Sequence, residues 1–255
     1  MGKMSKIEPM LAQNEVRGHK IGLALSGGSV RGIAHIGVIK ALGKAGIQPA
    51  IIAGTSVGSL VGAALAAGFQ WLDIEKMARE VFWPSLLNAK RLERFCAKWL
   101  PTNFEDLQLP FAAIASTVPG RKTVILKSGN LAEAISASCA IRVLRRPKSL
   151  NGDRLEDGGS SCVLPSVVCR QMGANFVIAS DVWEWSALLS GAGVTPAHHQ
   201  AARLYPRQYL FALSHTNALI KTPAPLAGYL PGSVNRLIAA GEAAAQNADF
   251  SKLSL

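Results

Sequence analysis

Apolar residues along the chain alternate between short continuous runs and longer segments with helical spacing. The runs at residues 21–25 and 51–53 are apolar throughout, which is typical of strands buried on both faces. Each run is followed by a turn containing glycine, and then by apolar positions three or four residues apart that end near Gly46 and Gly68. The first 70 residues therefore predict the order strand, helix, strand, helix. That order in turn predicts a parallel sheet with right-handed crossovers.

The pattern changes after this opening unit. Residues 71–101 combine aromatic and basic side chains and predict two helices that are broken near Trp83 and Pro84. Further strands are predicted at 111–117, 123–127, 154–156 and 176–182, with helices at 130–139 and 163–172 and a mostly helical remainder interrupted by prolines at 223–231. We expect a flexible tail over residues 1–18, a core over 19–182 and a helical C-terminal extension over 183–255 packed on that core.

Composition supports a well-buried globular protein with an anionic partner. Hydrophobic residues make up 49% of the 255 positions and charged residues only 17%, and the net charge is +11. Phospholipid headgroups, nucleic acid or an acidic substrate would each suit this charge, and the chain contains no recognised nucleic-acid-binding motif. Residues 47–69 carry no charge and are long enough to span a bilayer, but their glycines and Pro49 favour two shorter elements that meet at a turn. The polar start of the chain is unlike a signal peptide and predicts a cytoplasmic protein.

Ser56 lies where the second predicted strand turns into the following helix. Gly54 and Gly58 flank it in the pattern Gly-x-Ser-x-Gly. A serine on so sharp a turn adopts a strained backbone, and only residues without a Cβ leave room beside it. Its hydroxyl then lies at a helix N-terminus, where backbone N–H groups favour a developing negative charge. The pattern predicts a nucleophilic serine, although chance occurrence is an alternative in a chain with 24 glycines.

The loop after the first predicted strand could stabilise an oxyanion. Its residues are Gly27, Gly28, Ser29, Val30, Arg31 and Gly32. The loop opens a helix, so its free backbone N–H groups are expected to point toward a bound anion. A dinucleotide-binding loop is a weaker alternative, because that fingerprint needs glycine where Ser29 stands and an acidic residue about 20 positions later.

Asp157 is a candidate for the base that an acyl hydrolase needs beside its nucleophile. It lies in a turn with Gly158 and Gly159, which leaves its carboxylate accessible, although an ordinary turn residue would look the same. Three histidines follow it and would permit a Ser–Asp–His triad, namely His198, His199 and His215. Another histidine, His35, lies in the first predicted helix and is expected to pack or cap there. The residues by themselves leave a dyad and a triad open.

Three ordered segments of the chain resemble one family. The opening segment 23–38, the GTSVG sequence around Ser56 and the triplet Asp157-Gly158-Gly159 are similar to the motifs of bacterial patatin-like phospholipases, and residues 135–140 resemble the segment before their active-site loop. The resemblance implies a three-layer α/β/α fold with a mostly parallel central sheet. It also implies a serine–aspartate dyad without a histidine, with Ser56 as nucleophile and Asp157 as base. An oxyanion site at Gly27, Gly28 and Ser29 would complete the site, with no metal or organic cofactor.

Some positions depart from the family pattern. Ser29 stands where the family has glycine, and a serine there would cost about 1 kcal/mol if the position needs a positive φ. Residues 141–147 are basic where the family has a proline-rich, aromatic loop, and residues 160–163 replace an asparagine and prolines. The alternative to an enzyme is therefore a regulatory or lipid-binding protein of the same fold with little catalysis.

These observations together predict a serine acyl hydrolase that cleaves phospholipid or lysophospholipid esters through an acyl-enzyme. The aromatic and basic residues of segment 71–100, with Arg142, Arg145 and Arg146, suit peripheral contact with an anionic membrane surface. The alternative is that the aromatic rings belong to the core and the charges to a solvated face. No nucleic-acid partner is expected.

Overall fold

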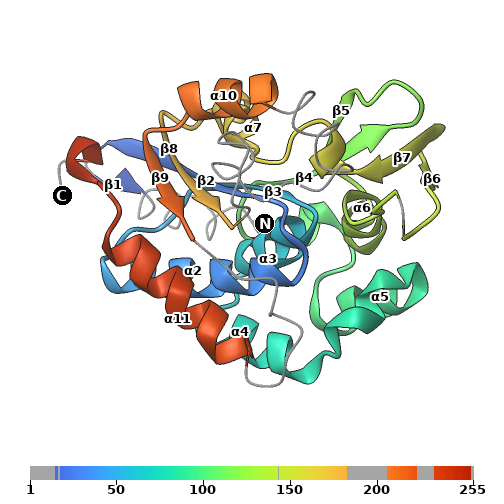
Figure 1. Ribbon diagram of the computed structural model, residues 1–255, viewed down its shortest axis with the longest axis horizontal. Helices are drawn as coiled ribbons and strands as arrows, with labels where there is room; N and C mark the ends of the chain where they lie inside the picture. Colours follow the sequence, from blue (N-terminus) through green and yellow to red (C-terminus); the bar gives the residue numbers. More distant parts are fainter. Residues whose placement is uncertain (1–14, 17, 143, 183–205, 223–232, 254–255) are drawn as a thin grey trace, which may run out of the picture.

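The computed structural model describes residues 15–16, 18–142, 144–182, 206–222 and 233–253, which form a mixed sheet with helices on both faces (Figure 1). The strand order is β6-β7-β4-β3-β2-β8-β9, with β1 paired to β2 and β5 to β4. The strands are β1 (Glu15–Val16), β2 (His19–Leu25), β3 (Ile51–Thr55), β4 (Phe111–Thr117), β5 (Thr123–Leu126), β6 (Lys148–Leu150), β7 (Asp153–Asp157), β8 (Phe176–Asp181) and β9 (Ala218–Lys221). The adjacent strands β4, β3, β2, β8 and β9 run parallel, so the predicted α/β fold with a mostly parallel sheet is confirmed.

Helices and short 3₁₀ turns connect these strands. The helices are α2 (Ala34–Lys44), α3 (Val57–Ala66), α4 (Trp71–Glu80), α5 (Ala89–Trp99), α6 (Leu131–Ser138), α7 (Ser166–Gln171), α10 (Pro206–Ser214) and α11 (Ser233–Gln246). The 3₁₀ turns are η1 (Ser29–Ile33), η2 (Trp83–Leu87), η3 (Phe104–Asp106), η4 (Gly158–Ser160) and η6 (Ser251–Leu253). The predicted break near Trp83 is confirmed, because η2 separates α4 from α5.

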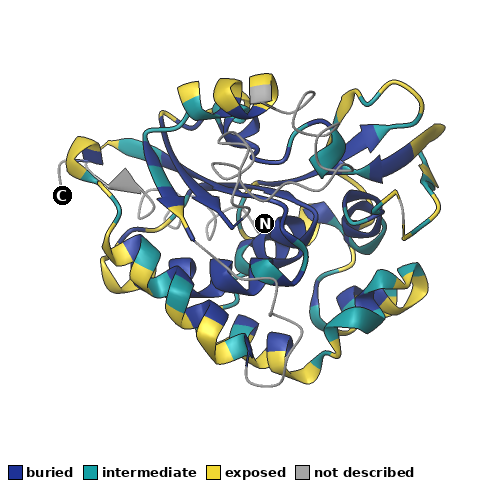
Figure 2. Cartoon of the chain, viewed as in Figure 1, coloured by how far each residue is buried: buried dark blue, intermediate teal, exposed yellow. Residues whose placement is uncertain are grey.

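Alternating side chains divide the core into two layers. Leu23, Leu25 and Ile178 face the layer that contains α2, α3 and α11, whereas Ala24 and Ala179 face α7 and α10. This two-residue period is the geometry of a β-strand, and both faces are apolar because helices cover both. Figure 2 shows the resulting distribution, with buried strands in the middle and exposed outer faces on the helices.

Most predicted elements are present, with one clear difference near the C-terminus. Residues 218–221 were expected within a mostly helical segment, but they form strand β9, which extends the sheet beside β8. Four residues are too few to display a strand period, and helices flank them on both sides. The uncharged stretch 47–69 divides into β3 and α3, as predicted, and no helix in the described residues has the length and apolarity needed to cross a membrane. The boundary between core and extension stays a prediction.

Two glycines bring the C-terminal helix α11 against α2. A Cβ on Gly37 would lie 1.9 Å from the carbonyl oxygen of Ile238, and a Cβ on Gly241 would lie 1.9 Å from that of Ala34. No side chain fits at either position, so the two backbones cross in direct contact. Glu242 lies one residue beyond this crossing and pairs with two lysines of α2, Lys40 at 2.6 Å and Lys44 at 2.8 Å.

We expect Gly241→Ala to destabilise the protein by about 1–3 kcal/mol, which is the typical cost of overpacking a close contact. Chemical denaturation measures the change in unfolding free energy. Gly43→Ala is the matched control, because a Cβ there meets nothing within 4 Å and alanine favours a helix. Equal stability of Gly241→Ala and the native protein would contradict the backbone contact.

Candidate active site

Ser56 occupies a strained turn between β3 and α3. Its φ of 53° and ψ of −125° lie outside the regions that serine favours, and its side chain is almost fully buried. A Cβ on Gly54 would lie 2.2 Å from the carbonyl oxygen of Gly58, and a Cβ on Gly58 would lie 2.4 Å from that of Leu25. Both glycines are therefore required by close backbone approach, as the elbow pattern predicts.

A hydrogen-bond chain holds this turn from outside. The Ser56 N–H donates to Oγ of Ser138 (2.9 Å), at the end of α6, and that hydroxyl donates to the carbonyl of Ile114 in β4 (2.5 Å). The chain ties the elbow to the neighbouring strand and to α6. Tertiary hydrogen bonds of this kind stabilise a backbone that local preferences would not adopt.

Strand register places Asp157 at the level of Ser56. Thr55, the last residue of β3, pairs with Ile114, and the next residue of β4, Ala115, pairs with Asp157 at the end of β7. One strand separates the two side chains, and the residue of that strand between them has only a methyl group. The sheet therefore brings together two residues that are 101 positions apart in the sequence.

The Asp157 carboxylate is half-buried and only partly hydrogen-bonded. Oδ1 accepts from the Gly159 N–H at 2.8 Å, while Oδ2 is shielded from solvent and has no hydrogen-bond partner in the described residues. Burial raises the pKa of Asp157 to about 6, and the Ser56 hydroxyl, the Gly159 N–H and the positive charge of Arg145 oppose this rise. A carboxyl group with this pKa can accept a proton near neutral pH.

The loop before η1 is fixed by a buried histidine. Nε2 of His35 lies 3.0 Å from the Ser26 carbonyl, which can only accept, so this nitrogen carries the proton. Nδ1 then accepts from the hydroxyl of Ser180, 2.8 Å away. Burial lowers the pKa of His35 to about 4, so the ring is neutral. His35 thus packs in the core, as expected, and orients the peptide that begins the predicted oxyanion loop.

The predicted oxyanion residues differ in what their N–H groups do. The Gly27 N–H donates to the carbonyl of Val163 at 3.0 Å, so this donor is already used and the expectation for Gly27 is wrong in this conformation. The Gly28 N–H has no acceptor in the described part of the chain. Ser29 has a φ of 54°, so this position does adopt the left-handed conformation and the serine is strained there. Arg31 and Gly32 lie in η1, and Gly158 and Gly159 in η4.

The basic segment after α6 directs one of its arginines inward and leaves the other two exposed. Arg145 donates to the carbonyl of Cys139 (3.0 Å) and to the hydroxyl of Ser136 (2.8 Å). The charge of Arg145 lowers the pKa of Asp157, so this arginine belongs to the site's electrostatics. Arg142 and Arg146 are exposed. The prediction that all three arginines face a membrane is therefore wrong for Arg145.

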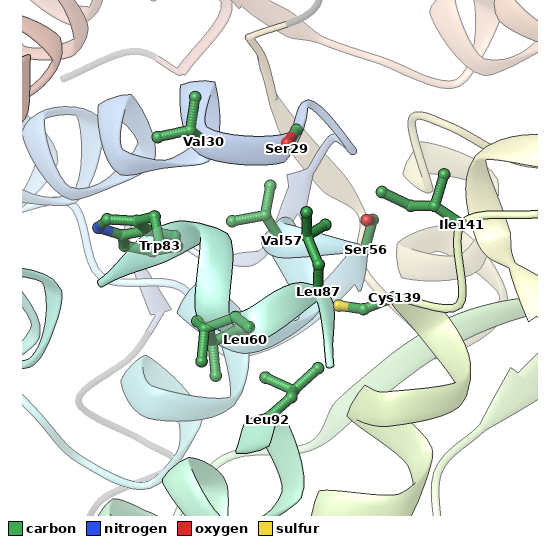
Figure 3. Close-up of a pocket in the computed structure, with 11 residues that line it drawn as sticks. Ser29, Val30, Ser56, Val57, Leu60, Trp83, Leu87, Leu92, Cys139 and Ile141 are labelled. Atoms are coloured by element: carbon green, nitrogen blue, oxygen red, sulfur yellow. The ribbon is translucent and has the colours of Figure 1, made fainter. Parts of the chain in front are cut away.

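An apolar cavity of about 60 Å³ opens beside Ser56 (Figure 3). Its lining residues come from η1, α3, η2, α5 and the segment after α6, and they are Ser29, Val30, Ser56, Val57, Leu60, Trp83, Leu86, Leu87, Leu92, Cys139 and Ile141. Burial raises the pKa of the Cys139 thiol to about 12, so this wall residue is uncharged. The sequence motifs located Ser56 but not this cavity, because its walls are ordinary apolar residues.

A family model described as patatin-like phospholipase matches residues 23–168, which is more than half of the chain. The chain belongs to the patatin-like phospholipase family. The matched region contains the elbow, the loop after β2 and Asp157, so the resemblance noted in the sequence is confirmed.

Several patatin-like relatives share about a third of their aligned residues with this chain. Patatin-like phospholipase domain-containing protein 6 from Mus musculus is 32% identical over 188 residues, covering 65% of this chain and 14% of that protein. Lysophospholipase NTE1 from Meyerozyma guilliermondii is 32% identical over 179 residues, covering 64% of this chain and 12% of that protein. An uncharacterized NTE family protein from Mycobacterium bovis is 34% identical over 187 residues, covering 67% of this chain and 52% of that protein. The chain thus spans about half the length of these relatives, or much less.

The crystal structure of VipD from Legionella pneumophila has a similar fold. Its TM-score is 0.58 at 13% sequence identity, with 89% of this chain and 66% of that chain covered. At this identity the likeness concerns the fold alone, which is the mixed α/β sheet with helices on both faces described above.

Proposed function

We propose that this patatin-like chain hydrolyses carboxyl esters of lipids, with Ser56 as nucleophile and Asp157 as general base. The observation that carries the proposal is the placement of two groups at one level of the sheet, beside an apolar cavity. They are the hydroxyl of Ser56, whose backbone is strained, and the half-buried carboxylate of Asp157. The hydroxyl supplies a nucleophile, the carboxylate accepts its proton, and the cavity suits an acyl chain. A fungal relative is named a lysophospholipase, which supports phospholipids or lysophospholipids as the substrate class.

The proposed reaction has two steps. Oγ of Ser56 bonds to the ester carbonyl carbon while its proton passes to Asp157, and the carbon–oxygen bond to the alcohol then breaks as the alcohol takes that proton. Water next attacks the carbonyl carbon of the acyl-enzyme and gives a proton to Asp157. The bond from that carbon to Oγ of Ser56 then breaks, Asp157 passes the proton to Oγ, and the fatty acid leaves. The Gly28 N–H and the N-terminus of α3 would stabilise the negative charge on the carbonyl oxygen, with Ser29 as a second candidate.

Replacing either proposed catalytic residue should remove activity without unfolding the protein. We expect Ser56→Ala to abolish labelling by a fluorophosphonate probe, and both Ser56→Ala and Asp157→Asn to lower ester hydrolysis by several orders of magnitude, because nucleophile or base is lost. Ser149→Ala, at an exposed position of β6, is the control and should label normally. A folded native protein that neither labels nor hydrolyses esters would instead support the lipid-binding alternative.

Histidine substitutions distinguish the dyad from a triad within the same experiment. His215 contacts Phe211 and Ser214 in α10, whereas His198 and His199 lie outside the described residues. Replacing all three by alanine should cost less than about tenfold in rate, or roughly 1.4 kcal/mol. A collapse of the rate in a folded single histidine variant would favour the triad.

The raised pKa of Asp157 predicts an acid limb in the rate profile. The base must be ionised, so kcat/KM for a neutral ester should fall as pH drops below about 6, the pKa of Asp157, rather than near its usual value of 3.8. The charge of Arg145 lowers this pKa, so Arg145→Gln should move the limb to higher pH. Arg154→Gln, an exposed change on β7, serves as the control. A limb near pH 4, or one unmoved by Arg145→Gln, would argue against this electrostatic account.

We further propose that the surface over this cavity docks on an anionic lipid surface. Trp71, Trp83, Phe95 and Trp99 are half-buried against the core, which narrows the predicted aromatic surface to Phe82, exposed by 74%. Leu144, exposed by 59%, lies toward the opposite end of the cavity from Phe82, because Ile141 near Leu144 and Trp83 beside Phe82 both line that cavity (Figure 3). Exposed basic residues lie on α5 and after α6, namely Lys90, Arg91, Arg94, Lys98, Arg142 and Arg146. A cytoplasmic location with contact at the inner face of the membrane stays a prediction.

Liposome co-sedimentation tests this docking. Binding should increase with anionic lipid and decrease with salt. The double variant Arg142→Glu with Arg146→Glu should weaken it, since each basic residue near the surface adds about 1 kcal/mol. The double variant Phe82→Asp with Leu144→Asp should also weaken it, because it replaces the exposed apolar side chains by charges that the anionic lipid repels. Leu210→Asp with Phe211→Asp is the matched control, because these residues are similarly exposed on α10, which covers the other face of the sheet. Equal binding to neutral and anionic liposomes would exclude electrostatic docking.

A further inference from the structure

Two cavities lie on either side of a pair of apolar side chains in the helical layer. The first is the cavity of about 60 Å³ that begins at Ser56. The second holds about 20 Å³ and is lined by residues of α2, α3, α4, η2 and α5, namely Ile36, Leu60, Val61, Ala64, Ile74, Met77, Ala78, Trp83 and Phe95. Leu60 and Trp83 line both cavities. These two side chains therefore form a partition between them.

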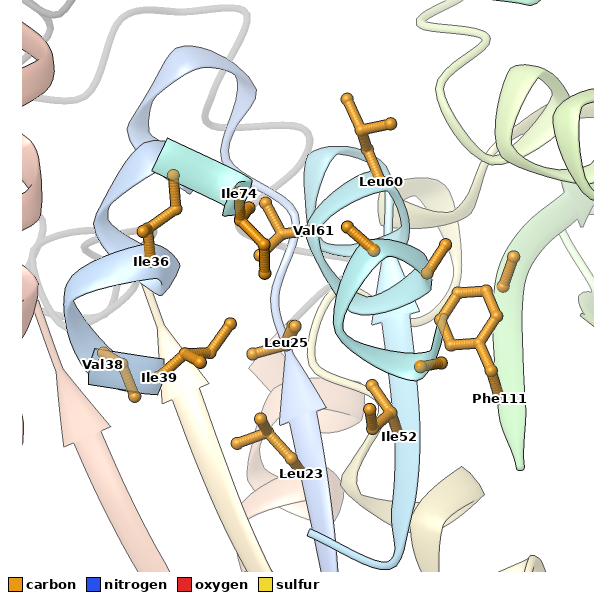
Figure 4. Close-up of a cluster of buried hydrophobic side chains, with 14 of the residues drawn as sticks. Leu23, Leu25, Ile36, Val38, Ile39, Ile52, Leu60, Val61, Ile74 and Phe111 are labelled. Atoms are coloured by element: carbon orange, nitrogen blue, oxygen red, sulfur yellow. The ribbon is translucent and has the colours of Figure 1, made fainter. Parts of the chain in front are cut away.

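One face of α3 runs past both cavities. Leu60 lies four residues after Ser56, which places it on the same helix face about 6 Å further along the axis. Val61 and Ala64 continue that face and line the second cavity. In Figure 3, Trp83 and Ser56 lie on opposite sides of the first cavity, and Figure 4 shows Val61 and Ile74 in the cluster next to Leu60.

The partition is held in place by its surroundings. The indole N–H of Trp83 donates to the carbonyl of Ala78, at the end of α4, at 3.1 Å. Leu60 projects from a helix whose first residue is anchored at the Ser56 elbow, and it is 6% exposed. The partition is therefore attached at two places, to α3 through the backbone of Leu60 and to α4 through the indole hydrogen bond of Trp83.

We propose that Leu60 and Trp83 are the end wall of the acyl-chain pocket and set the length of acyl chain that the enzyme prefers. The inference rests on the proposed function, in which an ester carbonyl lies at Ser56. A cavity volume of roughly 10–15 Å³ holds one group the size of a water molecule or a methylene. The first cavity, at about 60 Å³, therefore accepts about four to six such groups. An acyl chain that enters from Ser56 meets the wall after about that many carbons, and carbons beyond it gain no further burial there.

The test measures kcat/KM for a series of p-nitrophenyl esters with acyl chains from two to twelve carbons. In the native protein the rate should rise about fourfold for each methylene that is buried, and the rise should stop at a break point. Leu60→Ala joins the two cavities, so its break point should move at least two carbons longer. Leu60→Phe fills the first cavity and should move the break point shorter, which keeps the proposal testable if Leu60→Ala does not fold.

Met77→Ala is the matched control, because Met77 lines the second cavity but not the first. It removes a comparable buried side chain behind the wall, so its break point should equal that of the native protein. An unchanged break point in folded Leu60→Ala, or an equal shift in Met77→Ala, would overturn the wall. A native protein that neither hydrolyses esters nor reacts with the fluorophosphonate probe would instead contradict the proposed function.

Discussion

The structure depends on a reversal of the backbone at Ser56, where a buried strand becomes a helix within one residue. The turn is feasible only because Gly54 and Gly58 have no side chain. The backbone passes so close to itself and to β2 at these positions that a methyl group would overlap a carbonyl oxygen. Its unfavourable φ is held by a hydroxyl from α6 and, through it, by a carbonyl of β4. The geometry of the serine thus depends on contacts with three other elements, α6, β4 and β2.

Two opposing effects set the charge of the Asp157 carboxylate beside this turn. The half-buried Asp157 would favour its neutral form, since its carboxylate is largely shielded from water, and the guanidinium of Arg145 counteracts that preference. The same arginine holds two groups of the preceding segment by hydrogen bonds, so one side chain both shapes the loop and adjusts the carboxylate. The basic sequence after α6 therefore has two parts, one directed inward and one exposed to solvent.

Local patterns predicted the parts of the fold that are determined locally. The elbow, the continuous apolar strands and the break at Trp83 follow from glycine placement, apolar runs and proline, and the structure contains all three. Features that depend on distant partners were not predictable in this way. The Gly27 N–H is occupied by Val163, 136 residues away, and β9 is a strand because β8 offers it an edge. The direction of Arg145 likewise depends on the carbonyl and hydroxyl groups that receive it.

The crossing of α2 and α11 has a consequence for how the molecule assembles. The helix that follows the η1 loop cannot bury its glycine face until a helix from nearly 200 residues later has been synthesised and has docked there. Contacts of such large sequence separation form slowly, because a long loop must close before the contact is gained. On the ribosome, the elbow and its sheet neighbours would thus emerge well before the layer above them is complete. Through that interval, the apolar face of α2 is a surface that chaperones could recognise.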